Sequence, residues 1–314
     1  MMNIKHVAVI GTGMMGPGIA AVVALAGYQV TLIAEKPEWV EEGLDKARGL
    51  MDQLRRHDLV GESACTAGQL ALRGTAELDS AVPNVELVIE AIYENLEAKR
   101  QMFQRLDRLT SPETLLATNT SGLSVTAISE LAERRERIAT THFWMPPHLV
   151  PLVEVVMSPY TAEATAQALL GFLRACGKKP VLVRKDLPGQ LANRVLQAMI
   201  REATSLVQEG VASPEDVDSA IKNGIGIRLP VWGILEHIDA VGLDLGMAVQ
   251  NTVLPALNNE PHAVRLLADK VSQGDLGVKS GKGFYDWRAR DIEALKELRD
   301  EFIIQTLQLK ARHS

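Results

Sequence analysis

The strongest constraint on the fold of this chain is residues 7–20, which read VAVIGTGMMGPGIA. They join a short apolar strand to a glycine-rich turn and then to an apolar helix over residues 18–26. Gly11 permits a tight turn, Gly13 lets a phosphate group approach the backbone, and Gly16 lets the helix pack closely on the strand. Free N–H groups at the start of the helix favour a pyrophosphate. The segment therefore predicts a dinucleotide-binding site rather than only a tight turn.

Composition and charge narrow the class of protein. The 314 residues are enough for two domains, and the net charge of −6 argues against nucleic acid or an anionic membrane as the main partner. The apolar run 19–26 is too short to span a bilayer, and no basic segment precedes it, so we expect a cytoplasmic protein. Cys65 and Cys176 have no metal-ligand spacing, so we expect two buried thiols and no metal site.

Short β-branched runs alternate with helical patterns from residue 4 to about residue 184, which predicts a parallel sheet with crossover helices. A charged segment, residues 39–74, is typical of a helical hairpin inserted into this fold. The expected strands are Ile4–Ile10, Val30–Ile33, Leu87–Ile89, Leu115–Thr118, Ile138–Phe143, Val153–Met157 and Val181–Val183.

A boundary is expected where Pro and Gly interrupt the pattern at residues 185–189, which is also the expected hinge. Later segments are helical, including residues 193–208 and a helix that Ser213 and Pro214 begin. The sequence thus predicts an α/β Rossmann-like N-terminal domain (residues 1–184) with an all-α C-terminal domain (residues 185–314). Because so small a helical domain leaves apolar faces uncovered, we expect a homodimer.

His142 and Glu154 are the first candidates for chemistry. Glu154 interrupts an aliphatic strand, and His142 ends the strand before it. Taken alone, each residue has an ordinary structural explanation. Glu154 could be a carboxylate that faces water from an edge strand, and His142 could be a histidine with a structural role. Prolines 146, 147 and 151 force a turn between the strands, which could bring the imidazole beside the carboxylate. A histidine held in this way is a suitable general base for a hydroxyl proton.

Ser121 and Asn193 are the second pair of candidates. Ser121 follows an apolar strand at its carboxyl end, where doubly wound folds bind ligands. It could instead cap a helix, although Ser124 is better placed to do so. Asn193 begins a long helix just after the predicted boundary, so its amide could reach a substrate oxygen or cap that helix.

Motifs spread along the chain carry a resemblance. In order they are GTGMMG (11–16), VIEAIYENLEAK (88–99), NTSGLS (119–124), HFW (142–144), LVEV (152–155), KDLPGQLANR (185–194) and GKGFY (281–285). Together they resemble the 3-hydroxyacyl-CoA dehydrogenase family, over nearly the whole chain. The run PPHLVPLVE (146–154) also resembles the branch of that family that contains L-gulonate 3-dehydrogenase and lens lambda-crystallin.

The resemblance implies hydride transfer between a 3-hydroxyacyl-CoA and NAD, giving a 3-keto product. His142 would take the hydroxyl proton, Glu154 would orient it, and Ser121 and Asn193 would bind the reacting oxygen. Glu94 and Lys99 would line the ribose and nicotinamide side of the cofactor. Without the resemblance, Glu94 would be explained as an acidic residue at the start of a helix and Lys99 as a lysine on a solvated helix face. The implied cofactor contacts are Gly11, Gly13, Met14, Met15, Gly16, Glu35, Ala91, Glu94, Lys99 and Asn119.

The chain departs from the family pattern at the position that would bind the adenosine ribose of the cofactor. Ala34 stands where the family has an Asp at the end of the second strand. Glu35 could supply that carboxylate and keep NAD, whereas Lys36 could attract a 2′-phosphate and favour NADP. We expect NAD.

A second departure concerns the substrate. Met145 replaces the Asn that follows the family's catalytic histidine, and a thioether is a weak acceptor. Arg55 and Arg56 could pair with CoA phosphates or form a solvated helix face. The alternatives to an acyl-CoA are a free 3-hydroxy acid such as L-gulonate and a catalytically silent dinucleotide-binding protein. His142→Ala separates the silent protein from an enzyme.

Overall fold

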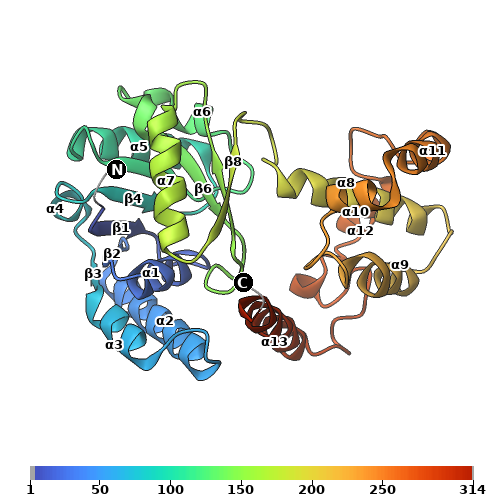
Figure 1. Ribbon diagram of the computed structural model, residues 1–314, viewed down its shortest axis with the longest axis horizontal. Helices are drawn as coiled ribbons and strands as arrows, with labels where there is room; N and C mark the ends of the chain where they lie inside the picture. Colours follow the sequence, from blue (N-terminus) through green and yellow to red (C-terminus); the bar gives the residue numbers. More distant parts are fainter. Residues whose placement is uncertain (1–3, 313–314) are drawn as a thin grey trace. The chain divides into compact units, whose positions relative to one another are not determined.

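The computed structural model describes residues 4–312, and the chain forms two compact units, Met1–Arg194 and Val195–Ser314 (Figure 1). The N-terminal unit is built on an eight-stranded sheet, and the C-terminal unit is helical. This is the predicted fold class. The domain boundary expected after residue 184 stays a prediction.

The sheet has the strand order β3-β2-β1-β4-β5-β6-β7-β8. All neighbouring strands run parallel except β6 and β7, which are antiparallel. The order reverses direction between β1 and β4, which is the switch point at which such sheets bind ligands. The strands are β1 (His6–Ile10), β2 (Gln29–Ile33), β3 (Leu72–Thr75), β4 (Leu87–Glu90), β5 (Leu115–Thr118), β6 (Ile138–Phe143), β7 (Leu152–Val156) and β8 (Lys179–Val183).

Seven of these strands match predicted ones. The eighth, β3, was not predicted, and it lies at the end of the segment that was expected to be a helical hairpin. Residues 39–74 are not helical throughout, because α3 ends at Ala71 and residues 72–75 pair with β2. The strand escaped prediction because it lies at the sheet edge and buries only Leu72 fully, so it leaves no apolar run in the sequence. Gly74 is required there, since a Cβ would lie 2.4 Å from Val40 Cγ1.

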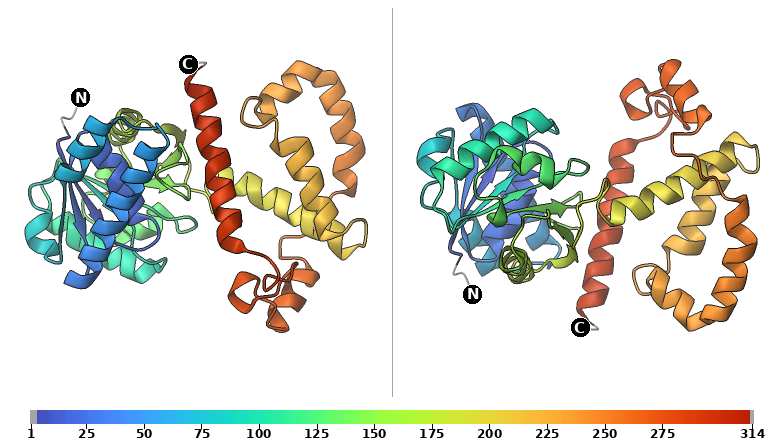
Figure 2. Two further views of the ribbon diagram at one scale, coloured as in Figure 1. Left: turned by 90° about the horizontal axis from the view of Figure 1, so that it is seen from below. Right: turned by 90° about the horizontal axis from the view of Figure 1, so that it is seen from above.

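Two apolar cores cover the two faces of the sheet. Along β1, Val7 and Val9 face one core and Ala8 and Ile10 face the other, as the two-residue period of a strand requires. α1, α2 and α7 contribute to the first core, and α4, α5 and α6 contribute to the second. Figure 2 shows helices on both sides of the sheet. The helices are α1 (Gly16–Leu25), α2 (Pro37–Arg56), α3 (Glu62–Ala71), α4 (Leu78–Ala81), α5 (Leu96–Leu109), α6 (Val125–Ile128) and α7 (Glu163–Ala175).

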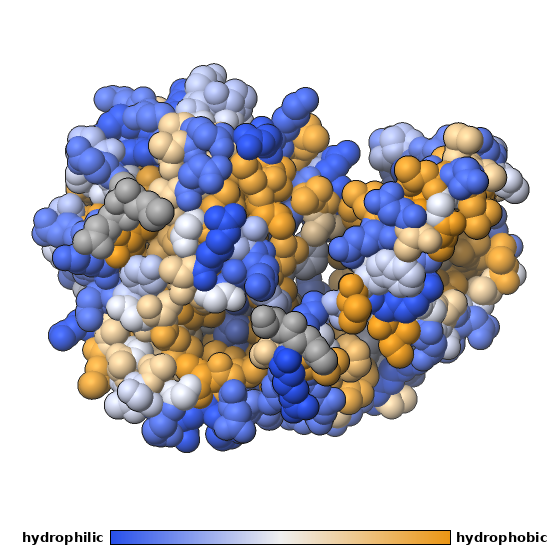
Figure 3. All heavy atoms as spheres, viewed as in Figure 1, coloured by the Kyte–Doolittle hydropathy of each residue, from blue (hydrophilic) through white to orange (hydrophobic). Residues whose placement is uncertain are grey.

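Helices continue after the sheet. α8 fills the predicted segment 193–208, and the Ser213 hydroxyl caps α9 by accepting the N–H of Asp216. Figure 3 shows many apolar residues at the surface of the C-terminal unit. Leu235 and Met247 are among the large apolar side chains that are exposed. The helices are α8 (Ala192–Gln208), α9 (Pro214–Ala220), α10 (Ile234–Val241), α11 (Leu243–Val253), α12 (Arg265–Ser272) and α13 (Ile292–Ala311).

Three sequence-based expectations concern metals, thiols and membranes. Within residues 4–312 the structure shows no group of His, Cys, Asp and Glu side chains that could hold a metal ion. Cys65 is buried, but Cys176 is only half-buried, which corrects the expectation of two buried thiols; burial nevertheless raises the pKa of Cys176 to about 12. Over the same residues, no helix is long and apolar enough to cross a membrane.

Candidate active site

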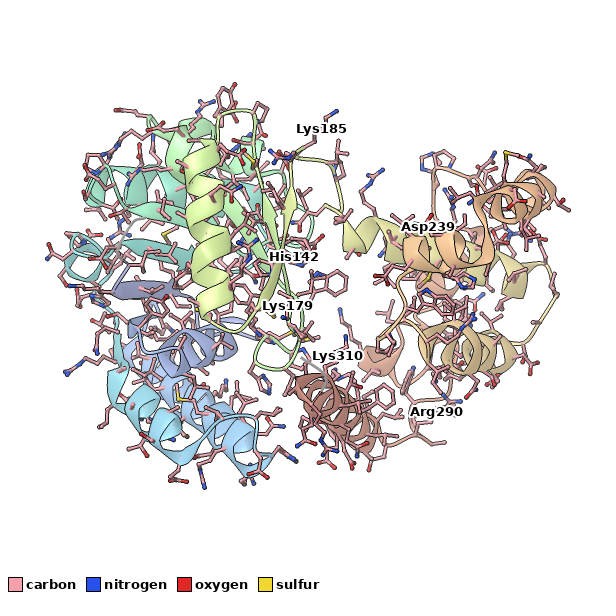
Figure 4. All side chains as sticks on the ribbon, in the orientation of Figure 1. His142, Lys179, Lys185, Asp239, Arg290 and Lys310 are labelled. Carbon is pink, nitrogen blue, oxygen red and sulfur yellow. The ribbon has the colours of Figure 1, made fainter. Side chains whose placement is uncertain are left out.

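The candidate residues gather where β1, β4, β5 and β6 end. The glycine-rich turn follows β1, Ala91 and Glu94 follow β4, and Ser121 follows β5. His142 lies at the end of β6, among the strands of the N-terminal unit (Figure 4). Because parallel strands end at one edge of a sheet, the fold assembles these segments from distant parts of the sequence.

The glycine-rich turn has the shape that a dinucleotide needs. Gly11 has a φ of +109°, and its N–H donates to the carbonyl of Ile33 over 2.8 Å. A Cβ on Gly11 would lie 2.5 Å from the carbonyl oxygen of Ala91, and a Cβ on Gly16 would lie 1.8 Å from that of Gly11. A Cβ on Gly13 would have no atom of the chain within 4 Å. The space beside Gly13 is therefore open to a ligand. At Gly11 and Gly16, in contrast, contacts within the chain itself leave no room for a side chain.

This difference predicts opposite results for two alanine substitutions. Gly16→Ala forces the backbone of the turn to shift, so we expect a loss of about 3 kcal/mol in the free energy of unfolding. Gly13→Ala should leave the melting temperature unchanged and weaken NAD binding about tenfold, because its methyl group occupies only the ligand's space. Thermal unfolding and NAD titration check both. Unchanged NAD affinity in Gly13→Ala would contradict the site.

His142, Glu154 and Ser121 form one hydrogen-bonded group. His142 and Glu154 are directly opposite each other on the antiparallel strands β6 and β7. The imidazole Nδ1 lies 2.7 Å from Glu154 Oε2, and Nε2 lies 3.2 Å from Ser121 Oγ. Glu154 is fully buried, whereas Ser121 is exposed. The ring thus connects a buried carboxylate to a hydroxyl at the surface of the N-terminal unit.

Four donors surround the Glu154 carboxylate. Oε1 accepts the N–H groups of Leu191 and Ala192, and Oε2 accepts Trp144 Nε1–H as well as the imidazole. Burial opposes ionisation, but hydrogen bonds from His142, Ala192, Trp144 and Leu191 outweigh it and lower the pKa of Glu154 to about 2. The carboxylate is therefore ionised at neutral pH. The stability that it contributes is present above its ordinary pKa and is lost as the pH falls toward 2.

A second network, formed by Lys99, Glu90 and residues 120–122, holds the side chain of Glu94. Lys99 is fully buried, and its Nζ lies 2.7 Å from Glu90 and 3.6 Å from Glu94. Glu94 Oε1 accepts the N–H groups of Ser121 and Gly122 and the hydroxyl of Thr120. Lys99 therefore does not point its ammonium into solvent but pairs with Glu90 and Glu94. Its proposed place on the nicotinamide side stays a prediction.

The remaining cofactor candidates lie around the same edge. The N–H of Ala91 donates to the Ile10 carbonyl over 2.7 Å, which joins the ends of β1 and β4. Asn119 Oδ1 accepts the N–H of Phe143 over 2.8 Å, which joins the loop after β5 to β6. Met14 and Met15 lie in the turn before α1, and Met14 is largely exposed.

Asn193 is a neighbour in sequence of a residue that binds Glu154. It lies in the first turn of α8, directly after Ala192, whose N–H reaches Glu154. Ser124, rather than Ser121, caps α6 by accepting the N–H of Ala127, as expected. The roles predicted for Ser121 and Asn193 stay predictions.

The two arginine candidates for substrate binding have partners within their own part of the chain. Arg55 lies in the last turn of α2, 3.1 Å from Glu62 and 3.7 Å from Asp52. Attraction by Glu62 raises the pKa of Arg55, and Arg56 Nε donates to the Asp52 carbonyl over 3.4 Å. Both guanidinium groups thus have partners on the helical hairpin. Met145 is half exposed and directly follows Trp144.

Sequence reasoning missed three contributors to this site, namely Trp144, Glu90 and the N–H groups of residues 191–192. Glu90 accepts Thr118 Oγ1–H and the N–H of Ile92 besides binding Lys99. A carboxylate inside an otherwise apolar strand was the available signal for Glu90, the same signal that led to Glu154. Nothing in the sequence indicated that an indole N–H or the start of α8 would reach Glu154.

Comparison with known proteins decides the family. A model described as the NAD binding domain of 3-hydroxyacyl-CoA dehydrogenase matches residues 6–187, and one described as the C-terminal domain of the same enzyme matches residues 189–287. The chain belongs to the 3-hydroxyacyl-CoA dehydrogenase family. It is therefore an oxidoreductase of the class that acts on CH–OH groups with NAD, and the resemblance drawn from its motifs is confirmed.

Relatives within the family differ in the substrate that they are named for. The probable 3-hydroxybutyryl-CoA dehydrogenase of Bacillus subtilis is 38% identical, with 92% of this chain and 99% of the relative covered. The 5-formyl-3-hydroxy-2-methylpyridine 4-carboxylate 5-dehydrogenase of Mesorhizobium japonicum is 34% identical, with coverages of 93% and 94%. A crystal structure of an enzyme of that second activity, described as an NAD+ dependent dismutase, matches with a TM-score of 0.91, 32% identity and 98% of each chain covered.

Proposed function

We propose that this family member interconverts a 3-hydroxyacyl-CoA and its 3-keto product with NAD as the cofactor. The observation that carries the proposal is the contact of His142 with both Glu154 and Ser121. In this arrangement His142 is the base, Glu154 is the partner that fixes the orientation of the base, and Ser121 offers a hydroxyl group where a substrate oxygen would bind. A silent dinucleotide-binding protein has no need to keep this arrangement.

In the proposed reaction, His142, Glu154 and Ser121 together bind the hydroxyl group of the substrate and remove its proton. With Glu154 ionised and bonded to Nδ1, the Nδ1–H tautomer is favoured and Nε2 is left with its lone pair. Nε2 faces Ser121 Oγ, so a substrate hydroxyl at that position can hydrogen-bond to both groups. His142 then takes the proton, and Glu154 stabilises the resulting imidazolium. A bound nicotinamide supplies the hydride acceptor.

The choice of NAD over NADP rests on the residues after β2. Ala34 offers no side-chain acceptor to a ribose, whereas Glu35, which is exposed and directly follows it, offers a carboxylate. Lys36 lies with Nζ 4.7 Å from the centre of the Trp39 ring, and this cation–π contact competes with binding of a 2′-phosphate. Glu35 also repels such a phosphate.

A compact aromatic or hydroxy carboxylate is the second candidate substrate. The ion pairs of Arg55 favour it, because they occupy a group that the CoA phosphates would need. The 34% identical relative named for a pyridine carboxylate shows that such a substrate occurs within the family.

Reduction of the nicotinamide distinguishes the candidates. Purified protein is offered NAD or NADP with 3-hydroxybutyryl-CoA, a longer 3-hydroxyacyl-CoA, L-gulonate, free 3-hydroxybutyrate or a hydroxymethylpyridine carboxylate, and absorbance of the reduced cofactor is followed. We expect turnover of a CoA ester with NAD. Turnover of free acids alone would replace the proposed substrate with the second candidate, and no turnover of any would contradict the proposal.

A homodimer formed through the C-terminal unit completes the proposal. Leu235, Leu243 and Met247 on α10 and α11 are 78%, 61% and 62% exposed. Large apolar side chains gathered in this way are typical of an interface. Light scattering should give twice the mass of the chain, and Leu235→Glu with Leu243→Glu should reduce it to the monomer. A monomeric parent protein would contradict the dimer.

A further inference from the structure

We propose that Trp144 is a positioning residue that limits how strongly Glu154 holds the protonated form of His142. The inference deepens the proposed function and rests on it for the role of His142. The indole Nε1–H and the imidazole Nδ1 share one oxygen, Glu154 Oε2, at 2.9 Å and 2.7 Å.

The carboxylate is held from two directions. Its other oxygen, Oε1, accepts the N–H groups of Leu191 and Ala192, each over 2.9 Å, at the start of α8. Each oxygen therefore has two donors, and the carboxylate cannot turn without losing hydrogen bonds. None of these four donors is an ammonium or guanidinium group, and the two side chains among them are His142 and Trp144.

The indole is well placed for this role. Its ring lies 5.6 Å from the imidazole ring, centre to centre, at a tilt of 51°. The loop that follows Trp144 is fastened, since Lys178 Nζ donates to the carbonyls of Pro147 and Val150 over 2.5 Å and 2.9 Å. A Cβ on Gly18 would lie 2.6 Å from Pro147 Cγ, which shows how closely α1 packs on the same loop. The direction of the indole N–H is thereby set by the fold.

Sharing an acceptor oxygen has a chemical consequence. A second donor on Oε2 withdraws electron density that would otherwise stabilise the imidazolium. Glu154 on β7 bonds to Nδ1, and Glu94 accepts the N–H of Ser121, whose hydroxyl bonds to Nε2. Neither contact requires the indole. Removal of the N–H alone should therefore make the protonated ring more stable and His142 slower to lose its proton.

Trp144→Phe tests the inference because it removes the N–H and keeps an aromatic ring. Trp287→Phe, in the C-terminal unit, is the matched control. With ¹³C-labelled histidine and a His142→Gln spectrum for assignment, we expect the titration midpoint of the His142 ring to rise by about half a pH unit in Trp144→Phe and to stay in place in the control. An unchanged midpoint in Trp144→Phe would overturn the inference.

Kinetics separate this inference from the proposed function. In Trp144→Phe we expect the acid limb of kcat/KM for oxidation to move up with the titration midpoint. We expect kcat for reduction of the 3-keto compound, in which His142 gives up its proton, to fall about twofold, with KM changed less than about twofold. A rise in KM with constant kcat would instead make Trp144 a substrate contact and overturn the inference. If the parent protein turns over no substrate while the midpoint still moves, the positioning role stands and the proposed function fails.

Discussion

Replacement of His142 with alanine is expected to lower kcat about 10³-fold and to leave the dissociation constant for NAD within about twofold of its original value. Alanine removes the imidazole ring that bonds to both Ser121 and Glu154. The glycine-rich turn does not depend on the imidazole, so cofactor binding remains. Stopped-flow measurement of the reduced nicotinamide and NAD titration check the two parts.

His57→Ala is the matched control for this substitution. His57 is an exposed histidine that directly follows α2, and it is not among the residues that bond to His142, Glu154 or Ser121 in the contacts described above. Its replacement should leave kcat unchanged. A residual rate within tenfold of the parent in His142→Ala would exclude His142 as the base.

Glu154→Gln is expected to lower kcat by about 10³-fold, with little effect on KM. An amide of the same size removes the charge that stabilises the imidazolium, and its NH₂ group can reverse the hydrogen bond to Nδ1 and favour the wrong tautomer. The pH dependence of kcat with a saturating substrate measures the effect.

Glu163→Gln provides the comparison, because Glu163 is an exposed carboxylate that bonds to Gln167 and Arg184 on the surface. It should retain full activity. If Glu154→Gln kept more than about a third of the parent rate while folded, the carboxylate would be structural and the proposed mechanism would lose its second member.

Much of the fold follows from local sequence signals. The strand, glycine turn and helix at residues 7–25 are encoded together, and buried strands such as β4 and β5 leave continuous apolar runs. β3 left no such run because it is an edge strand, so residues 39–74 were expected to be helical throughout. Edge strands depend on a neighbour that the sequence does not place.

The candidate site was only partly predictable for a related reason. Prolines between two strands indicated that His142 and Glu154 could meet, and the antiparallel register places them opposite each other. The buried pair of Lys99 and Glu90 depends on side chains from a helix and a strand that meet only in the folded unit. The indole contact of Trp144 depends on the direction in which a fastened loop leaves β6. Such contacts need three-dimensional structure.

Transfer of the label from 3-hydroxybutyryl-CoA deuterated at C3 is the measurement that tests the central claim most directly. The protein is mixed with NAD and this substrate, and the reduced cofactor is isolated and its deuterium content determined by mass spectrometry. A His142-dependent dehydrogenase predicts one deuterium in each reduced cofactor, and no reduction in the His142→Ala variant. Reduced cofactor without deuterium, or equal reduction by the variant, would contradict the account.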